Sequence, residues 1–112
     1  MNISFHGIGQ VCATFLGSGI TEGHVVKMSE RGTVAACGDG SDFCGVAVCC
    51  KDDACSVQVE GFVTVGYSGT VPTVGWGTLA ANGAGGVKAA EGGRTFLVVN
   101  ADTTAKTVTI KL

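Results

Sequence analysis

The six cysteines are the residues of this sequence best suited to chemistry, and four of them fall within twelve positions, from Cys44 to Cys55. Thiolates bind zinc and exchange disulfides, so one interpretation is a cysteine-coordinated metal centre or a redox module. Structural zinc sites usually contain short Cys-x2-Cys pairs. The sequence has no such pair, and the neighbours Cys49 and Cys50 would point to opposite faces of a strand.

Two other interpretations need no metal. Cys50 and Cys55 flank a turn of four residues, which could bring them opposite one another for a cross-strand disulfide. The favoured interpretation is that the cysteines are small packing residues. No basic region followed by an apolar stretch opens the sequence, so we expect folding in a reducing cytoplasm, where thiols stay reduced.

The other reactive side chains form no recognisable centre. His6 or His24 could in principle activate a cysteine, but no third residue that would orient such a pair is indicated. Lys51 could be the modified lysine of a biotinyl-like or lipoyl-like carrier, although the residues around it do not resemble that motif. We therefore expect no enzymatic activity, no cofactor and no metal. Four aspartates in two turns could bind calcium weakly, but their spacing does not match a calcium-binding loop: Asp39, Asp42, Asp52 and Asp53.

The composition narrows the possible partners. Of the 112 residues only 14% are charged, the net charge is −2, and the seven basic residues form no cluster. Nucleic-acid binding needs clustered Lys and Arg, so we expect no such partner. The longest nearly apolar run, Phe43 to Cys50, is too short to span a bilayer. So little charge beside so many apolar residues predicts that part of the surface meets another protein.

The periodicity predicts an all-β fold. Apolar and polar residues alternate from Cys55 to Tyr67 and from Thr107 to Leu112, with an expected bulge or bend at Gly61. Strands recur about every ten residues, which is typical of a small antiparallel β-barrel or sandwich with short hairpins. Turns are expected at four places: Ser29–Gly32, the Asp39-Gly40 hairpin dipeptide, Lys51–Ala54 and Asn82-Gly83. Gly17-Ser18-Gly19 would separate an N-terminal strand or arm, residues 1–19, from a single domain of residues 20–112.

The order of these segments resembles that of a known family. "GHVVKMSERGTVAACGDGSDFCGVAV" is followed by "VQVEGFVTVGYSGTVPTVGWGTLAANGAGGVKAA" and by "FLVVNADTTAKTVTIKL". This order is similar to that of small capsid decoration proteins of tailed phages and prophages, also called head-stabilising or cement proteins. The resemblance extends over nearly the whole chain, including the "SFHGIGQVCATF" start.

The resemblance implies a function without catalytic residues. Such a protein binds the outer surface of the capsid through the major capsid protein, often as trimers, and stabilises the expanded shell. It would be assembled in the host cytoplasm and end on the virion surface. The residues expected at the capsid or subunit interface are apolar side chains of the N-terminal arm and of the Thr70–Gly77 connection: Phe5, Ile8, Phe15, Pro72 and Trp76. The cysteine content is higher than this role requires.

Overall fold

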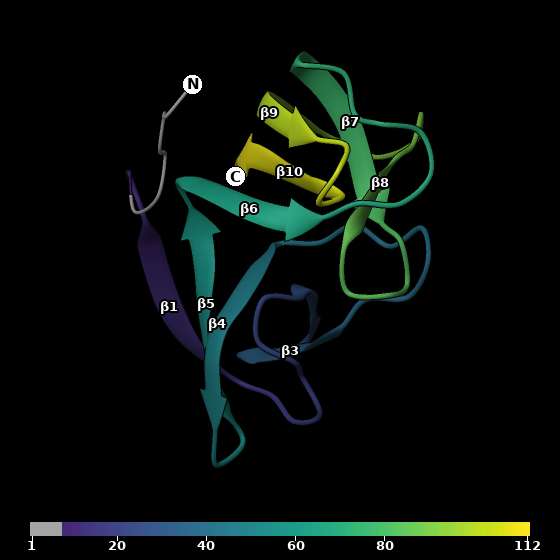
Figure 1. The fold of residues 1–112 in the computed structure, drawn as a ribbon. Helices are drawn as coiled ribbons and strands as arrows, with labels where there is room; N and C mark the ends of the chain where they lie inside the picture. Colours follow the sequence, from purple (N-terminus) through teal and green to yellow (C-terminus); the bar gives the residue numbers. More distant parts are fainter. Residues whose placement is uncertain (1–7) are drawn as a thin grey trace.

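The computed structural model describes residues 8–112, and this part of the chain contains β-strands and no helix, which confirms the all-β prediction. The strands form a small closed barrel and a second five-stranded sheet above it (Figure 1). Their bounds are β1 Val11–Leu16, β2 Val25–Glu30, β3 Thr33–Ala36, β4 Gly45–Lys51, β5 Ala54–Glu60, β6 Phe62–Gly66, β7 Gly75–Ala81, β8 Val87–Ala89, β9 Arg94–Asp102 and β10 Thr107–Lys111.

The barrel has the strand order β1-β3-β2-β4-β5 and closes by pairing of β1 with β5. Its hairpins β2–β3 and β4–β5 turn where the sequence predicts. Asp52 and Asp53 both have positive φ, at 52° and 63°, as the two central residues of a type I′ hairpin require. All neighbours are antiparallel except β1 and β3, which meet in parallel at the pair Leu16 and Thr33.

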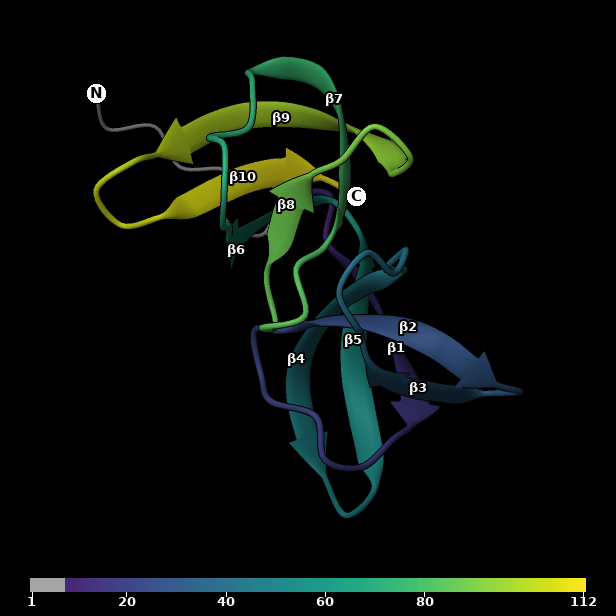
Figure 2. The same cartoon turned by 90° about the vertical axis from the view of Figure 1, so that its right-hand side faces the viewer.

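The second sheet has the order β6-β10-β9-β7-β8 and curls back on itself (Figure 2). Tyr67, just beyond β6, forms a parallel bridge with Val87 at the start of β8. The Ser68 amide also donates to the Val87 carbonyl at 3.0 Å. The two edge strands therefore meet at one end, which reduces the exposed length of the sheet edges.

Gly61 takes the chain from the barrel into the second sheet. Its φ is 95°, and a Cβ atom there would lie 2.6 Å from the carbonyl carbon of Gly9. The buried Gln58 amide donates to the carbonyls of Glu60 and Phe62, at 3.1 and 3.0 Å, and so holds both sides of this turn. The bend expected from the broken alternation is thus the point at which one strand ends and the next joins another sheet.

The first residues of β2 and β4 are buried on both faces of the strand. Val26 and Ala47 point into the barrel, whereas their neighbours Val25 and Val46 pack against the second sheet. Consecutive apolar residues, rather than alternating ones, are what a strand between two cores requires. The barrel core contains Val26, Val34, Ala47, Cys55 and Val57, and the larger core between the sheets contains Val25, Phe43, Val46, Val65, Tyr67, Leu79, Ala81, Val87, Phe96, Val98, Val108 and Ile110.

The connection between β3 and β4 differs from the sequence prediction. Asp39-Gly40 was expected to turn a hairpin, but β3 and β4 do not pair with each other because β2 lies between them. The connection instead reaches the second sheet, where Asp39 bridges to Asn82 and the Gly40 amide donates to the Ala81 carbonyl at 2.8 Å. The hairpin prediction was wrong because its local turn signal says nothing about which strand comes between.

This connection also joins the two sheets. Phe43 is buried and stacks on Phe96 of β9, with ring centroids 4.9 Å apart and an interplanar angle of 8°. Lys88 of β8 forms an ion pair with Asp39 at 2.9 Å. The aromatic pair is the larger contribution, because the ion pair is exposed to solvent and such pairs contribute little.

We predict that Gly45→Ala destabilises the protein. The new Cβ would collide with the Gln58 carbonyl oxygen and lie 2.7 Å from a Val57 methyl group, both in the strand facing β4. Overpacking of this kind costs roughly 1–3 kcal/mol of unfolding free energy, measurable by urea denaturation. Gly92→Ala is the matched control, since nothing lies within 4 Å of a Cβ there. Equal stability of the two variants would contradict the packing described for β4.

Candidate functional site

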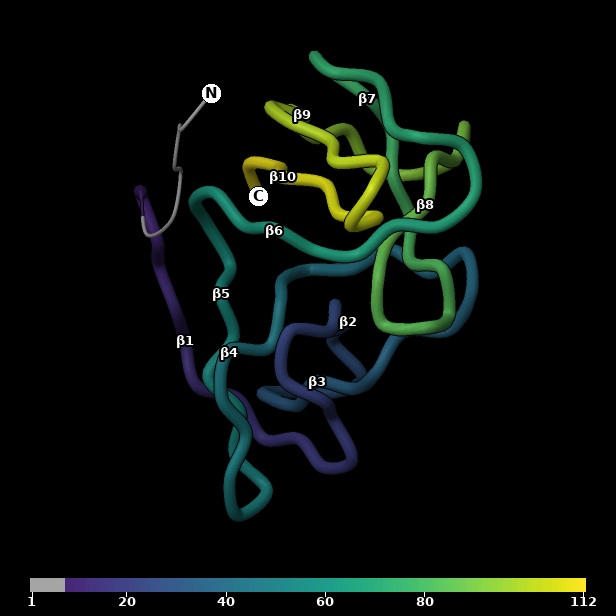
Figure 3. Tube along the Cα trace, viewed as in Figure 1, coloured from purple at the N-terminus to yellow at the C-terminus, as the bar shows by residue number. Residues whose placement is uncertain are grey.

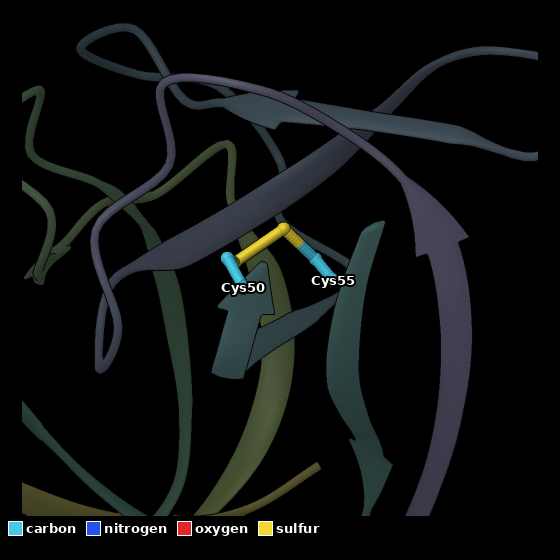
Figure 4. Close-up of a disulfide and its surroundings, with 2 residues drawn as sticks. All are labelled: Cys50 and Cys55. Carbon is cyan, nitrogen blue, oxygen red and sulfur yellow. A yellow bond between two sulfur atoms is a disulfide. The ribbon is translucent and has the colours of Figure 1, made fainter. Parts of the chain in front are cut away.

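The cysteines do not form a metal centre in the described structure. Within residues 8–112 no three His, Cys, Asp or Glu side chains gather closely enough to hold a metal ion. Cys50 and Cys55 form a disulfide across the β4–β5 hairpin (Figure 4). The favoured prediction of six reduced thiols is therefore wrong for this pair, because the hairpin register places the two residues directly opposite each other.

The hydrogen-bond alternation explains why this pair can be bridged. The Leu16 amide donates to the Gly32 carbonyl, so the backbone groups of Leu16 face away from β5, and those of Phe15 and its partner Cys55 face each other. On β5, the backbone groups of Cys55 then face β1, not β4. Cys50 and Cys55 are thus a non-hydrogen-bonded antiparallel pair, the closer type, with Cα atoms 4.1 Å apart. Closing so short a loop stabilises the fold by about 2 kcal/mol on the chain-entropy estimate.

The other four cysteines are free and lie in two environments. Cys12 and Cys49 are exposed, whereas Cys37 and Cys44 are half-buried. Burial raises the pKa of the Cys37 thiol, against a smaller lowering effect of Lys27. Burial also raises the pKa of Cys44, opposed mainly by a backbone hydrogen bond. A raised pKa disfavours the reactive thiolate, which is the opposite of what a catalytic cysteine needs.

The one described histidine has a packing role. A Cβ atom at Gly85 would collide with the His24 ring, so the imidazole lies against the backbone of the β7–β8 turn. His6 lies outside the described residues. Within residues 8–112, no hydrogen bond joins the His24 ring to a cysteine.

The expected contact residues fall in different environments. Phe5 lies outside the described residues. Ile8 is 51% exposed, whereas Phe15 is half-buried and packs against the barrel core. Pro72 is buried, and Trp76 is 75% exposed, the most exposed of the large apolar side chains described.

Strand β1 presents an apolar surface that the sequence reading found only in part. Val11 and Leu16 are 48% and 60% exposed and, with Ile8, form what we call the β1 surface. Residues 8–16 carry no charge, although exposed edge strands are usually protected by charged side chains. Of the expected arm, residues 11–16 are a paired strand of the barrel.

Within residues 8–112, the outer edge of β1 is also unpaired along most of its length. The Leu16 amide points toward β3, where it donates to the Gly32 carbonyl. Because the backbone groups of every second residue in a strand point to the same side, those of Cys12 and Thr14 also point toward this edge. Among residues 8–112, β1 meets β3 only at the Leu16 pair, so Cys12 and Thr14 face no strand there. These backbone groups could accept an added strand from another protein.

A second surface surrounds Trp76. A groove of about 390 Å³ lies between the β6–β7 connection and the β8–β9 turn, and Trp76 is one of its lining residues. We call it the Trp76 groove; it is lined by Thr70, Pro72, Thr73, Trp76, Gly77, Thr78, Leu79, Ala89, Ala90, Glu91 and Val98. The Thr70–Gly77 connection expected from the sequence contributes Thr70 and Thr73, but the sequence reading missed the Ala and Glu residues, because they come from a segment about twenty positions away.

The two surfaces lie on different sides of the molecule. In Figures 1 and 3, β1 runs along the left edge, while the connection from β6 to β7 loops out on the right before β7 begins at the top.

Comparisons with known proteins do not assign the chain to a family. No protein family matches the chain, and the search of curated proteins finds no significant match. The described residues also include no helix with the length and hydrophobicity needed to cross a bilayer.

We predict that the cysteines divide into three classes. Alkylation by iodoacetamide near pH 8, just below the usual thiol pKa of about 8.5, should modify Cys12 and Cys49 first. Cys37 and Cys44 should lag, since their raised pKa leaves less thiolate, and they should catch up after unfolding. Peptide mass spectrometry would show four free thiols before reduction and six after it. Rapid labelling of Cys44, or six thiols without reductant, would contradict this arrangement.

Proposed function

We propose that this protein is a structural virion protein that binds the outer surface of a phage capsid and stabilises the expanded shell. The observation that carries the proposal is the β1 surface, an uncharged strand edge that leaves Ile8, Val11 and Leu16 in water. The resemblance of the motif order to capsid decoration proteins supplies the partner, the major capsid protein. It also implies that copies are grouped as trimers on the shell.

The expected binding free energy per copy suits a partner that offers many identical sites. Burying the exposed halves of three aliphatic side chains would contribute roughly 3 kcal/mol, and each new backbone hydrogen bond about 1 kcal/mol. Such a contact is modest for a single copy, after the cost of association. A shell offers many identical sites, so many modest contacts together could reinforce it, and trimers would add avidity.

The test is co-sedimentation with expanded shells of the encoding phage that lack this protein. We expect saturable binding of the wild-type protein at a fixed ratio to the shell protein. Leu16→Asp should weaken binding by tenfold or more, because it places a charge within the apolar contact. Met28→Asp is the matched control; Met28 is 45% exposed on β2, two strands from β1 in the barrel. Absence of wild-type binding, or equal binding of both variants, would contradict the proposal.

A deletion of residues 1–7 separates the N-terminal segment from the strand. Removing residues 1–15 would also remove most of β1 and open the barrel, so the shorter deletion is the informative one. If Phe5 contributes to shell binding, the shortened protein should keep its unfolding transition and bind more weakly. Unchanged binding would confine the contact to residues 8–16.

A further inference from the structure

The shell contact proposed for β1 is too small to act alone. A specific protein interface buries roughly 800 Å² on each partner. Even a large aromatic side chain buries only about 150–250 Å², so the half-exposed side chains of Ile8, Val11 and Leu16 supply less than half of that area. A shell that binds the β1 surface therefore has to cover neighbouring residues as well.

One of the two sides next to β1 is charged. The hairpin between β2 and β3 lies beside the end of β1, where Leu16 pairs with Thr33. This hairpin carries Glu30 and Arg31, and both are exposed. The centre of a protein interface is usually depleted of charged residues. We therefore expect the contact to extend in the other direction, onto β5 and β4.

The outer face of β5 and β4 continues the β1 surface with almost no charge. The row formed by Phe15, Cys55 and Cys50 points into the barrel core, so the rows on either side of it point outward. These two outward rows cross the three strands in the order β1, β5, β4: Thr14, Ser56 and Cys49, and Leu16, Ala54 and Lys51. Lys51, next to the hairpin turn, is their one charged member.

The outward side chains are accessible, and those of the central strand are small. Leu16 and Cys49 are exposed on the outer strands, while Ala54 and Ser56 on β5 are half-buried. The bulge in β4 adds Val48, which is 42% exposed. Larger apolar side chains on β1 and β4 thus accompany small ones on β5, so that another protein can approach the sheet closely.

We propose that the outer face of β1, β5 and β4 forms, together with the open edge of β1, the contact with the shell protein. This inference rests on the proposed function and adds the kind of surface that the partner presents. Covering the hydroxyls of Thr14 and Ser56 without hydrogen bonds would be costly. The matching surface of the shell protein is therefore uncharged and apolar, with a few hydrogen-bonding groups opposite these hydroxyls.

Native cysteines make the experiment direct, because Cys12 on β1 and Cys49 on β4 are both exposed thiols. Expanded shells saturated with the protein are treated with iodoacetamide, and peptide mass spectrometry gives the alkylation rate of each cysteine. We expect both rates to be at least tenfold lower than in the free protein.

The outcomes separate this inference from the proposed function. If Cys12 is protected on the shell but Cys49 keeps the rate of the free protein, the contact is limited to the edge of β1. That result would overturn the inference and leave the proposed function in place. If the wild-type protein does not sediment with shells at all, the proposed function fails, and the inference fails with it.

A charge on the central strand gives a second test. Ser56→Asp should weaken shell binding at least tenfold. Ser29→Asp is the matched control, since Ser29 is exposed on β2 beside the charged hairpin turn. Cys49→Asp repeats the test at an exposed position, and thermal unfolding verifies that each variant is folded. Equal shell binding by Cys49→Asp and Ser29→Asp would overturn the inference.

Discussion

The fold depends on the starts of β2 and β4, whose first residues are buried between two hydrophobic cores. Val25 and Val26 are adjacent, yet one packs toward the second sheet and the other into the barrel, and Val46 and Ala47 do the same on β4. A chain of 112 residues has little interior, and using one pair of strands for two cores makes both possible. The close approach of Gly45 to β5 and the Phe43–Phe96 stack keep this central layer in place.

This arrangement determines which surfaces remain free. With β2 and β4 in the centre, β1 is left on the outside of the barrel, held by β5 and touching β3 at one end. On the other sheet, Pro72 of the β6–β7 connection is buried, whereas Trp76 at the start of β7 is exposed. Within residues 8–112, the β1 surface is apolar with an unpaired backbone edge, whereas Trp76 presents an exposed aromatic ring.

The sequence predicted where the strands lie better than which strands pair with one another. Period-two alternation identifies the strands, and Asp52-Asp53 and Asn82-Gly83 mark real hairpins, because both depend on local backbone preference. Asp39-Gly40 carries the same local signal, but there the chain crosses to the other sheet. Strand order arises from contacts between distant residues, which no short window contains.

The candidate sites show the same difference between what a local sequence signal predicts and what only the packing of distant segments determines. Trp76 stood out in the sequence as a lone large ring between glycines, and it is exposed; Pro72, four residues earlier, is buried. Glu91 and Thr70 could not be linked by sequence, since only the packing of β7 between β8 and β9 brings their segments together. The Cys50–Cys55 bridge could be predicted as one alternative from the hairpin. Its preference over free thiols depends on the two residues forming a non-hydrogen-bonded pair, and this pairing type follows from the contact between β1 and β3.

Hydrogen–deuterium exchange on free and shell-bound protein tests the central claim most directly. If the open edge of β1 contacts the shell, the amides of Cys12 and Thr14 should exchange fast in the free protein and become protected on binding. Peptides that cover residues 70–79 should exchange equally in both states. Protection at residues 70–79 with none at residues 8–16 would contradict the account, because the Trp76 side would then face the shell.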